Sequence, residues 1–211
     1  CGLEHTGTTL ISDLFRQIPG IDSGFEGGVL LRGTPAEFPS VQPFYGNMLN
    51  GWKVSQEDMD ACCAAPDHDG FYEELRARAK VLAPDTRAIF DKTPRYLSEL
   101  TAVLGRTDVP AVVSYKDPRA IVCSDYKRAA PKDFDVWYDN YMPAKRRYVR
   151  QCYDEFIRHQ GTGRVATVGL EELAMNSRAA MERIFSHVGE RFELSYTVIK
   201  ELRYAHTKRP S

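Results

Sequence analysis

The chain has 211 residues, the length of one ordinary globular domain, so we expect a single domain over residues 1–211. Its 28 Lys and Arg residues nearly balance 29 Asp and Glu residues, so the net charge gives no reason to expect a surface for nucleic acids or anionic membranes, and any anion site must be local. The five cysteines form no CxxC pair and have no His-rich partner, so we expect free thiols, no zinc site and a cytoplasmic location.

The first predicted helix covers residues 8–17, where apolar residues recur at helical spacing, and it ends before Pro19 and Gly20. The loop in front of it opens at Cys1, although a loop of this type normally follows a strand. We therefore expect a first strand, and with it any membrane anchor or targeting segment, to lie upstream of Cys1. No stretch of the chain itself approaches the roughly 20 apolar residues of a transmembrane helix.

Residues 19–70 are rich in Gly, Pro and Asn, which indicates loops with short helical pieces, and such a segment commonly shapes a substrate pocket. Beyond them, predicted helices and strands alternate. Helices are expected at 70–83, 96–104, 118–130, 134–160 and 177–188, and strands at 87–90, 109–115 and 164–168. The longest helix contains Pro143, which should kink or split it. The alternation predicts an α/β fold with a doubly wound, mainly parallel sheet flanked by helices.

A phosphate-binding loop is predicted at residues 2–9, where the sequence GLEHTGTT directly precedes the first helix. Its glycines and backbone amides lie at a helix N-terminus, which favours a bound phosphate. The spacing is that of a nucleoside triphosphatase loop, but Thr8 occupies the position where that loop requires lysine. Because that lysine bridges the terminal phosphates, its replacement argues against a kinase or ATPase and leaves anion binding intact. A glycine-rich turn capped by threonines is the structural alternative.

Four segments together resemble the family of sulfotransferases that depend on 3′-phosphoadenosine 5′-phosphosulfate (PAPS). Residues 2–9 resemble its first loop, G-x-x-[RK]-[ST]-G-T-T, and residues 115–126 (YKDPRAIVCSDY) resemble its 3′-phosphate element, V-R-D-P-R-A-x-x-x-S-x-Y. Residues 91–96 (DKTPRY) and 170–173 (LEEL) are similar to its [DE]-K-[ST]-P-x-Y element and its late Y-E-D-L stretch. The joint order and spacing of four such segments would seldom arise by chance.

This resemblance implies a P-loop-like fold, PAPS as the donor, adenosine 3′,5′-bisphosphate as the product and no metal. It is closer to the carbohydrate, protein and bacterial branch than to the small-molecule cytosolic branch, whose K-G-x-x-G element is not present in the sequence.

The resemblance also implies a donor site in two parts. The loop residues that would hold the 5′-phosphate are Gly2, His5, Thr6, Gly7, Thr8 and Thr9. In the second part, Lys116 corresponds to a cation on the 3′-phosphate and Ser124 supplies a hydroxyl, which together make charge-assisted hydrogen bonds. Arg119 ranks second, because a surface ion pair is an equally good account of it.

Three residues are predicted to act in catalysis. Lys92 follows a short predicted strand, at the carboxyl end of the sheet where ligands of open α/β folds bind, and the family implies that it offsets charge on the transferring group. His5 stands where the family usually has Arg or Lys, and it carries full charge only below its pKa, which is near 6.5 when unperturbed. Glu26, a glutamate set among glycines, is the predicted general base. Asp91 would only pair with Lys92 or cap the turn.

The predicted reaction is in-line transfer of a sulfuryl group from PAPS to an acceptor hydroxyl or amine. The acceptor is expected to be a sugar, lipid, peptide or small molecule, and the sequence does not distinguish among them. Two alternatives stay open: a P-loop kinase that uses ATP and magnesium, and a nucleotide-binding module without catalysis, to which the departure at His5 is the only pointer. The basic run at residues 203–209 is interpreted as a solvated tail.

Overall fold

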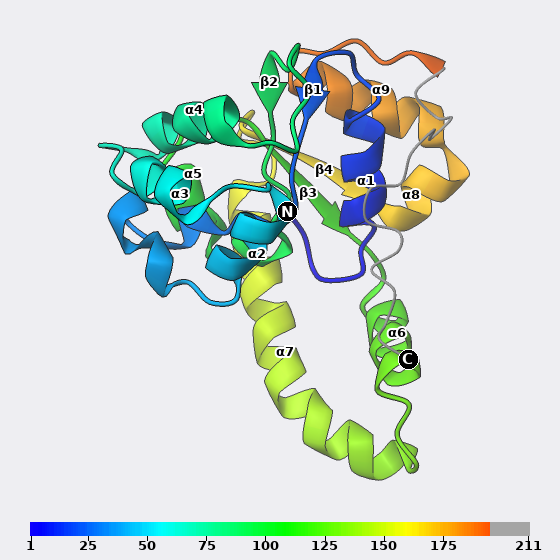
Figure 1. The fold of residues 1–211 in the computed structure, drawn as a ribbon. Coiled ribbons are helices and arrows are strands. Elements are labelled where there is room, and N and C mark those ends of the chain that lie inside the picture. Colours follow the sequence, from blue (N-terminus) through cyan, green and yellow to red (C-terminus); the bar gives the residue numbers. More distant parts are fainter. Residues whose placement is uncertain (195–211) are drawn as a thin grey trace. The chain divides into compact units, whose positions relative to one another are not determined.

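The computed structural model describes residues 1–194 of the chain (Figure 1). These residues divide into two compact units. The first unit consists of residues 1–8 and 94–191, and the second of residues 9–93 and the segment that starts at residue 192. The basic run at residues 203–209 lies outside the described residues.

The first unit is built around two parallel strands, β3 (Ala111–Tyr115) and β4 (Val165–Gly169). The register runs from Ala111 opposite Val165 to Tyr115 opposite Gly169. On β3 the backbone also pairs with the start of the chain, because Gly2 forms a parallel bridge with Ser114. The Ser114 amide donates to the carbonyl of Cys1 at 2.9 Å. The start of the chain therefore lies beside β3, in the position of a neighbouring strand.

Helices supply the rest of the first unit. They are η3 (Pro94–Glu99), α5 (Leu100–Leu104), α6 (Pro118–Ala129), α7 (Phe134–His159), α8 (Leu170–Met175) and α9 (Ser177–His187). Helix α6 begins with a proline, whose missing N–H would have no intrahelical partner there, and the side chain of Asp117 caps it. The core brings Leu3 together with Val113, Ile121 and other apolar side chains from β3, η3, α5 and α7. The base of the predicted phosphate loop is thus anchored by apolar burial.

The second unit is mainly helical. Its elements are α1 (Thr8–Phe15), which begins at the last residue of the first unit, β1 (Ile21–Asp22), η1 (Val29–Leu31), η2 (Pro35–Ser40), α2 (Phe44–Gly51), α3 (Gln56–Cys63), α4 (His68–Arg78) and β2 (Ala88–Ile89). Strands β1 and β2 pair in parallel. Fully buried Phe38, Met48, Trp52 and Phe71 form much of the core, and the rings of Phe38 and Phe71 meet edge to face with centroids 5.7 Å apart.

The predicted α/β class, with parallel strands flanked by helices, is confirmed. Within residues 1–194 the strands form two separate pairs rather than one continuous sheet. The β1–β2 ladder is only two residues long, because beyond Asp22 the hydroxyl of Ser23 donates to the carbonyl of Phe90 at 2.6 Å in place of a backbone amide. The helix expected at 70–83 is displaced to His68–Arg78, since Asp67 caps it by accepting from the amide of Gly70.

Pro143 does not split the long helix, which continues from Phe134 to His159 and curves along its length in Figure 1. A proline removes one helical hydrogen bond, so a bend is expected there. Side chains on both sides of the proline are tied to Asp125 of α6, by a hydrogen bond from the hydroxyl of Tyr141 and an ion pair with Lys145 at 2.9 Å. These contacts hold the two halves of α7 against the same neighbour.

None of the helices described in residues 1–194 combines the length and the apolar character needed to cross a membrane. Over the same residues, no three His, Cys, Asp or Glu side chains are grouped as a metal site.

Candidate active site

The predicted phosphate loop closes tightly around two glycines. A Cβ atom on Gly2 would lie 2.5 Å from the carbonyl oxygen of Ser114, so only glycine allows the backbone to approach β3 this closely. Gly7 has a φ of +85°, in the left-handed region, and a Cβ there would lie 2.8 Å from Cδ1 of Leu170. Helix α1 begins at the next residue, Thr8, so the loop leads directly into a helix N-terminus.

Thr6 braces this loop from within. Its side chain is fully buried, and its hydroxyl donates to the carbonyl of Leu3 at 2.6 Å and lies 2.7 Å from the hydroxyl of Ser114. The hydroxyl of Thr6, which was predicted to hold the 5′-phosphate, is therefore already hydrogen-bonded to Leu3 and Ser114. Thr9, in contrast, is exposed on the first turn of α1.

The structure brings Lys116, Ser124 and the phosphate loop together. Lys116 follows β3 directly, and its Nζ donates to the carbonyl of His5 at 3.2 Å and to the hydroxyl of Ser124 at 2.9 Å. The Ser124 hydroxyl in turn donates to the carbonyl of Ala120. Only 8% of Lys116 is exposed, and among the described residues it has no carboxylate partner. A buried ammonium held only by neutral oxygens favours an added anion at this place.

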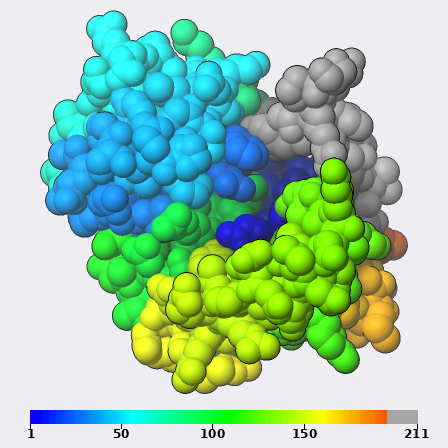
Figure 2. All heavy atoms as spheres, turned by 90° about the horizontal axis from the view of Figure 1, so that it is seen from below, coloured from blue at the N-terminus to red at the C-terminus, as the bar shows by residue number. Residues whose placement is uncertain are grey.

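His5 lies in a cluster of charged groups that sequence reasoning did not assemble. Its Nε2 accepts a hydrogen bond from the guanidinium of Arg128 and lies 3.8 Å from Oδ1 of Asp125, both on α6. Asp125 is paired with Lys145 of α7 at 2.9 Å. In Figure 2, the spheres of α6 and α7 run from light green to yellow and are exposed on the face in view.

The pKa of His5 is lowered from its ordinary value. Partial burial is the main cause, followed by the positive charge of Arg128, while Asp125 and Glu4 act in the opposite direction. His5 is therefore neutral at neutral pH.

The turn between β3 and α6 is fixed by Asp117. Its carboxylate accepts from the amide of Arg119 and pairs with the Arg119 guanidinium at 2.5 Å, and these hydrogen bonds lower its pKa to about 2. The Arg119 side chain is 91% exposed, so the structure places it in a surface ion pair. The amide of Asp117 donates to Glu171 of α8, which links the late LEEL segment to this turn.

In the second unit, Glu26 and Lys92 contact each other. They were predicted to act on the acceptor and on the transferring group. Nζ of Lys92 lies 2.8 Å from Oε1 of Glu26, with side chains 10% and 22% exposed, and the ammonium lies 5.0 Å from the ring centroid of Phe25. Partial burial shields this pair from water, so its attraction exceeds that of a surface pair. The two side chains hold each other in position.

Asp91 does not pair with Lys92 in this arrangement. Its carboxylate accepts from the hydroxyl of Tyr72 at 2.7 Å, from the hydroxyl of Thr93 at 2.6 Å and from the amide of Gly27 at 3.2 Å. These bonds connect the segment after β2 to the glycine-rich loop that carries Glu26. Asp91 therefore acts as a structural residue, in agreement with the cap role weighed for it.

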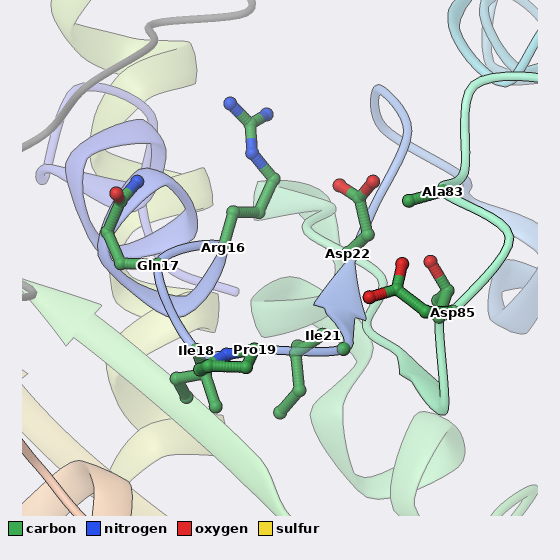
Figure 3. A pocket seen from close by; sticks show the side chains of 10 residues that line it. Arg16, Gln17, Ile18, Pro19, Ile21, Asp22, Ala83 and Asp85 are labelled. Carbon is green, nitrogen blue, oxygen red and sulfur yellow. The ribbon is translucent and has the colours of Figure 1, made fainter.

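A cavity of about 370 Å³ lies at the C-terminal end of α1 in the second unit (Figure 3). Arg16, Asp22 and Asp85 supply the charged groups of its lining, and Arg16 is paired with Asp13 at 3.0 Å. None of the predicted site residues lines this cavity, so the candidate site does not depend on it.

Comparison with known proteins gives a consistent result. The model of a protein family described as the sulfotransferase family matches residues 1–193, which include parts of both units. Among solved structures, the sulfotransferase domain of the olefin synthase from Synechococcus PCC 7002 is similar, with a TM-score of 0.66 and 16% sequence identity over 95% of this chain and 75% of that chain. At this identity the likeness supports the fold alone. A search of curated proteins found no match.

Proposed function

The chain belongs to the sulfotransferase family, and on that basis we propose that it transfers a sulfuryl group from PAPS to an acceptor hydroxyl or amine. The observation that carries the choice of donor is the buried Nζ of Lys116, which bridges the phosphate loop and Ser124 without a carboxylate partner among the described residues. A terminal phosphate at this place would give the ammonium an anionic partner and would offer the Ser124 hydroxyl a charged acceptor in exchange for the Ala120 carbonyl.

The residues present fit such a donor. The loop offers backbone amides, two glycines at positions of close approach or positive φ, and the N-terminus of α1, which together suit the 5′-phosphate. Lys116 and Ser124 would hold the 3′-phosphate. When bound, PAPS supplies a sulfuryl group activated by its link to a phosphate, and no metal is required in this proposal.

The acceptor step is assigned to the Glu26–Lys92 pair. Glu26 takes the proton from the acceptor hydroxyl or amine, and Lys92 offsets negative charge on the transferring group. The ion pair supports both roles, because it holds the carboxylate and the ammonium in fixed positions beside each other. His5, with Nε2 occupied by Arg128, keeps Nδ1 for donation.

The proposal is tested by thermal unfolding with nucleotides. Adenosine 3′,5′-bisphosphate at a hundred times its dissociation constant should stabilise the fold by about 2.7 kcal/mol, which raises Tm by several degrees for a chain of this size. ATP with magnesium should have a much smaller effect, because Thr8 replaces the lysine that a kinase loop requires. The reverse order of the two nucleotides would reject the sulfotransferase assignment in favour of a kinase. Binding without sulfate transfer to any sugar, lipid, peptide or phenol would indicate a non-catalytic module.

A further inference from the structure

Two cations of the first unit converge on His5 from different elements. Lys116, after β3, donates to its backbone carbonyl, and Arg128 of α6 donates to its ring. Neither cation has a carboxylate within ion-pair distance among residues 1–194, whereas the neighbouring Lys145 is neutralised by Asp125 at 2.9 Å. Arg128 is also exposed, and thus accessible to a ligand, and it lies four residues after Ser124 on the same face of α6.

The direction of the Arg128 contact decides which of the two residues carries the charge. A guanidinium has only donors and stays charged at every pH of interest, so Nε2 of His5 must be the acceptor and the ring must be neutral, with its proton on Nδ1. The lowered pKa of His5 agrees with this state. The permanent positive charge next to the loop is therefore that of Arg128.

We propose that Arg128 is a donor-binding residue, which contacts a phosphate or sulfate oxygen of the bound nucleotide, and that His5 is the positioning residue that directs the guanidinium to the phosphate loop. This inference rests on the proposed function of the same site. It differs from the sequence prediction, in which His5 itself supplied the charge.

The test removes the positive charge of Arg128 from α6 and then restores a positive charge at position 5 of the phosphate loop. Arg128→Gln should weaken the affinity for adenosine 3′,5′-bisphosphate about tenfold to a hundredfold, the effect of one charge-assisted hydrogen bond. The double variant His5→Arg/Arg128→Gln should recover most of that loss, because it returns a permanent cation to the same place. Arg150→Gln removes an exposed arginine of α7 that lies 3.9 Å from Asp154, and it should bind like the unaltered chain. Affinities are measured by calorimetry.

A second measurement follows the ring of His5 by NMR. The unaltered chain should show the Nδ1–H tautomer at neutral pH, and Arg128→Gln should raise the pKa of His5, because a nearby positive charge is removed. The other charged groups that face this ring are Asp125 of α6, Lys145 of α7 and Glu4 of the loop, and the ammonium of Lys116 lies on the His5 carbonyl. All of them stay in place in this variant.

The outcomes separate the two proposals. If the unaltered chain binds no bisphosphate, the proposed function fails and the role of Arg128 fails with it. If the unaltered chain binds it and Arg128→Gln binds equally well, only the inference about Arg128 is overturned. A loss in Arg128→Gln that the double variant does not recover, with an unchanged His5 pKa, would show a structural arginine and would likewise overturn it.

Discussion

At the scale of single residues, the Glu26–Lys92 pair offers the sharpest test of catalysis. Replacing Glu26 with Gln keeps the size and the hydrogen-bonding capacity of the side chain but removes its ability to accept a proton. Turnover of Glu26→Gln should fall about a hundredfold to ten-thousandfold, as expected for loss of a general base, and bisphosphate affinity should stay unchanged.

The matched control for this variant is Glu73→Gln, which alters an exposed glutamate of α4 in the same unit. It should retain full turnover. Near-normal turnover in Glu26→Gln, measured with any acceptor found in a screen, would transfer the search for the base to Asp22.

Lys116 should show the opposite pattern. Lys116→Ala removes the ammonium that links the His5 carbonyl to Ser124, so bisphosphate affinity should fall about tenfold to a hundredfold before any change in the chemical step. Lys127→Ala, which removes an exposed lysine of α6, is the comparison. Equal affinities of the two variants in calorimetry would remove Lys116 from the donor site.

At the scale of elements, the contact of the chain start with β3 can be tested by a single methyl group. Gly2→Ala would place a Cβ 2.5 Å from the Ser114 carbonyl, where a backbone atom cannot move aside. We expect a loss of about 1–3 kcal/mol in the free energy of unfolding, the usual cost of overpacking, together with weaker nucleotide binding. Gly105→Ala, where the nearest atoms are 3.5 Å away, should unfold like the unaltered chain in urea. A Gly2→Ala chain of normal stability would mean that the bridge to Ser114 contributes little.

Sequence patterns predicted the helices and strands in which apolar residues recur at a regular spacing. Helices α1, α6, α7 and α9 and strands β3 and β4 were located to within a few residues, since one apolar face or one buried strand sets each pattern. The separate elements α2 and α3 were foreseen only as short helical pieces, because their starts are set by local caps such as Ser55, whose hydroxyl accepts from the amide of Asp58. Pro143 was expected to kink or split its helix, and the helix curves along its length without being split.

The site was predictable where its residues lie inside a motif. Lys116 and Ser124 are eight positions apart, and the strand, turn and helix between them bring the two side chains within 2.9 Å. Arg128 was not predicted, because its contact with His5 joins residues 123 positions apart. The one feature of the sequence that could have indicated it is its position four residues after Ser124. The Glu26–Lys92 contact likewise spans 66 positions, so each residue was proposed without knowledge of their pairing.

At the scale of the whole molecule, the reactivity of the cysteines can measure the packing of both units. None of the five is in a disulfide; Cys123 is exposed, while Cys62 and Cys63 in the second unit and Cys152 in the first are buried. Burial raises the pKa of Cys62 and Cys63 to about 11 and that of Cys152 to about 12. A thiol with a pKa of about 11 is roughly one part in a thousand ionised at pH 8, and the thiolate is the reactive form.

Cys123 should therefore react at pH 8 with a thiol reagent much faster than Cys62, Cys63 and Cys152, and all five should react at once in guanidinium chloride. Mass spectrometry of the labelled peptides identifies each site. Because the raised pKa values belong to the folded state, the difference should persist at every pH below about 10 and vanish on unfolding. Rapid labelling of Cys152 alone in the native chain would contradict the packing of the first unit, and rapid labelling of Cys62 that of the second.

The bridge between the chain start and β3 also has a consequence for the order of folding. The backbone nitrogen of Cys1 donates to the carbonyl of Val112 at 2.8 Å, a contact between residues 111 positions apart. Closing a chain segment of that length costs about 4 kcal/mol in entropy beyond a constant term. Residues 2–9 are synthesised before β3, but they cannot adopt the phosphate-binding conformation until β3 has emerged from the ribosome and collapsed onto them. A nascent chain arrested before Ala111 would carry the complete loop sequence and bind no nucleotide.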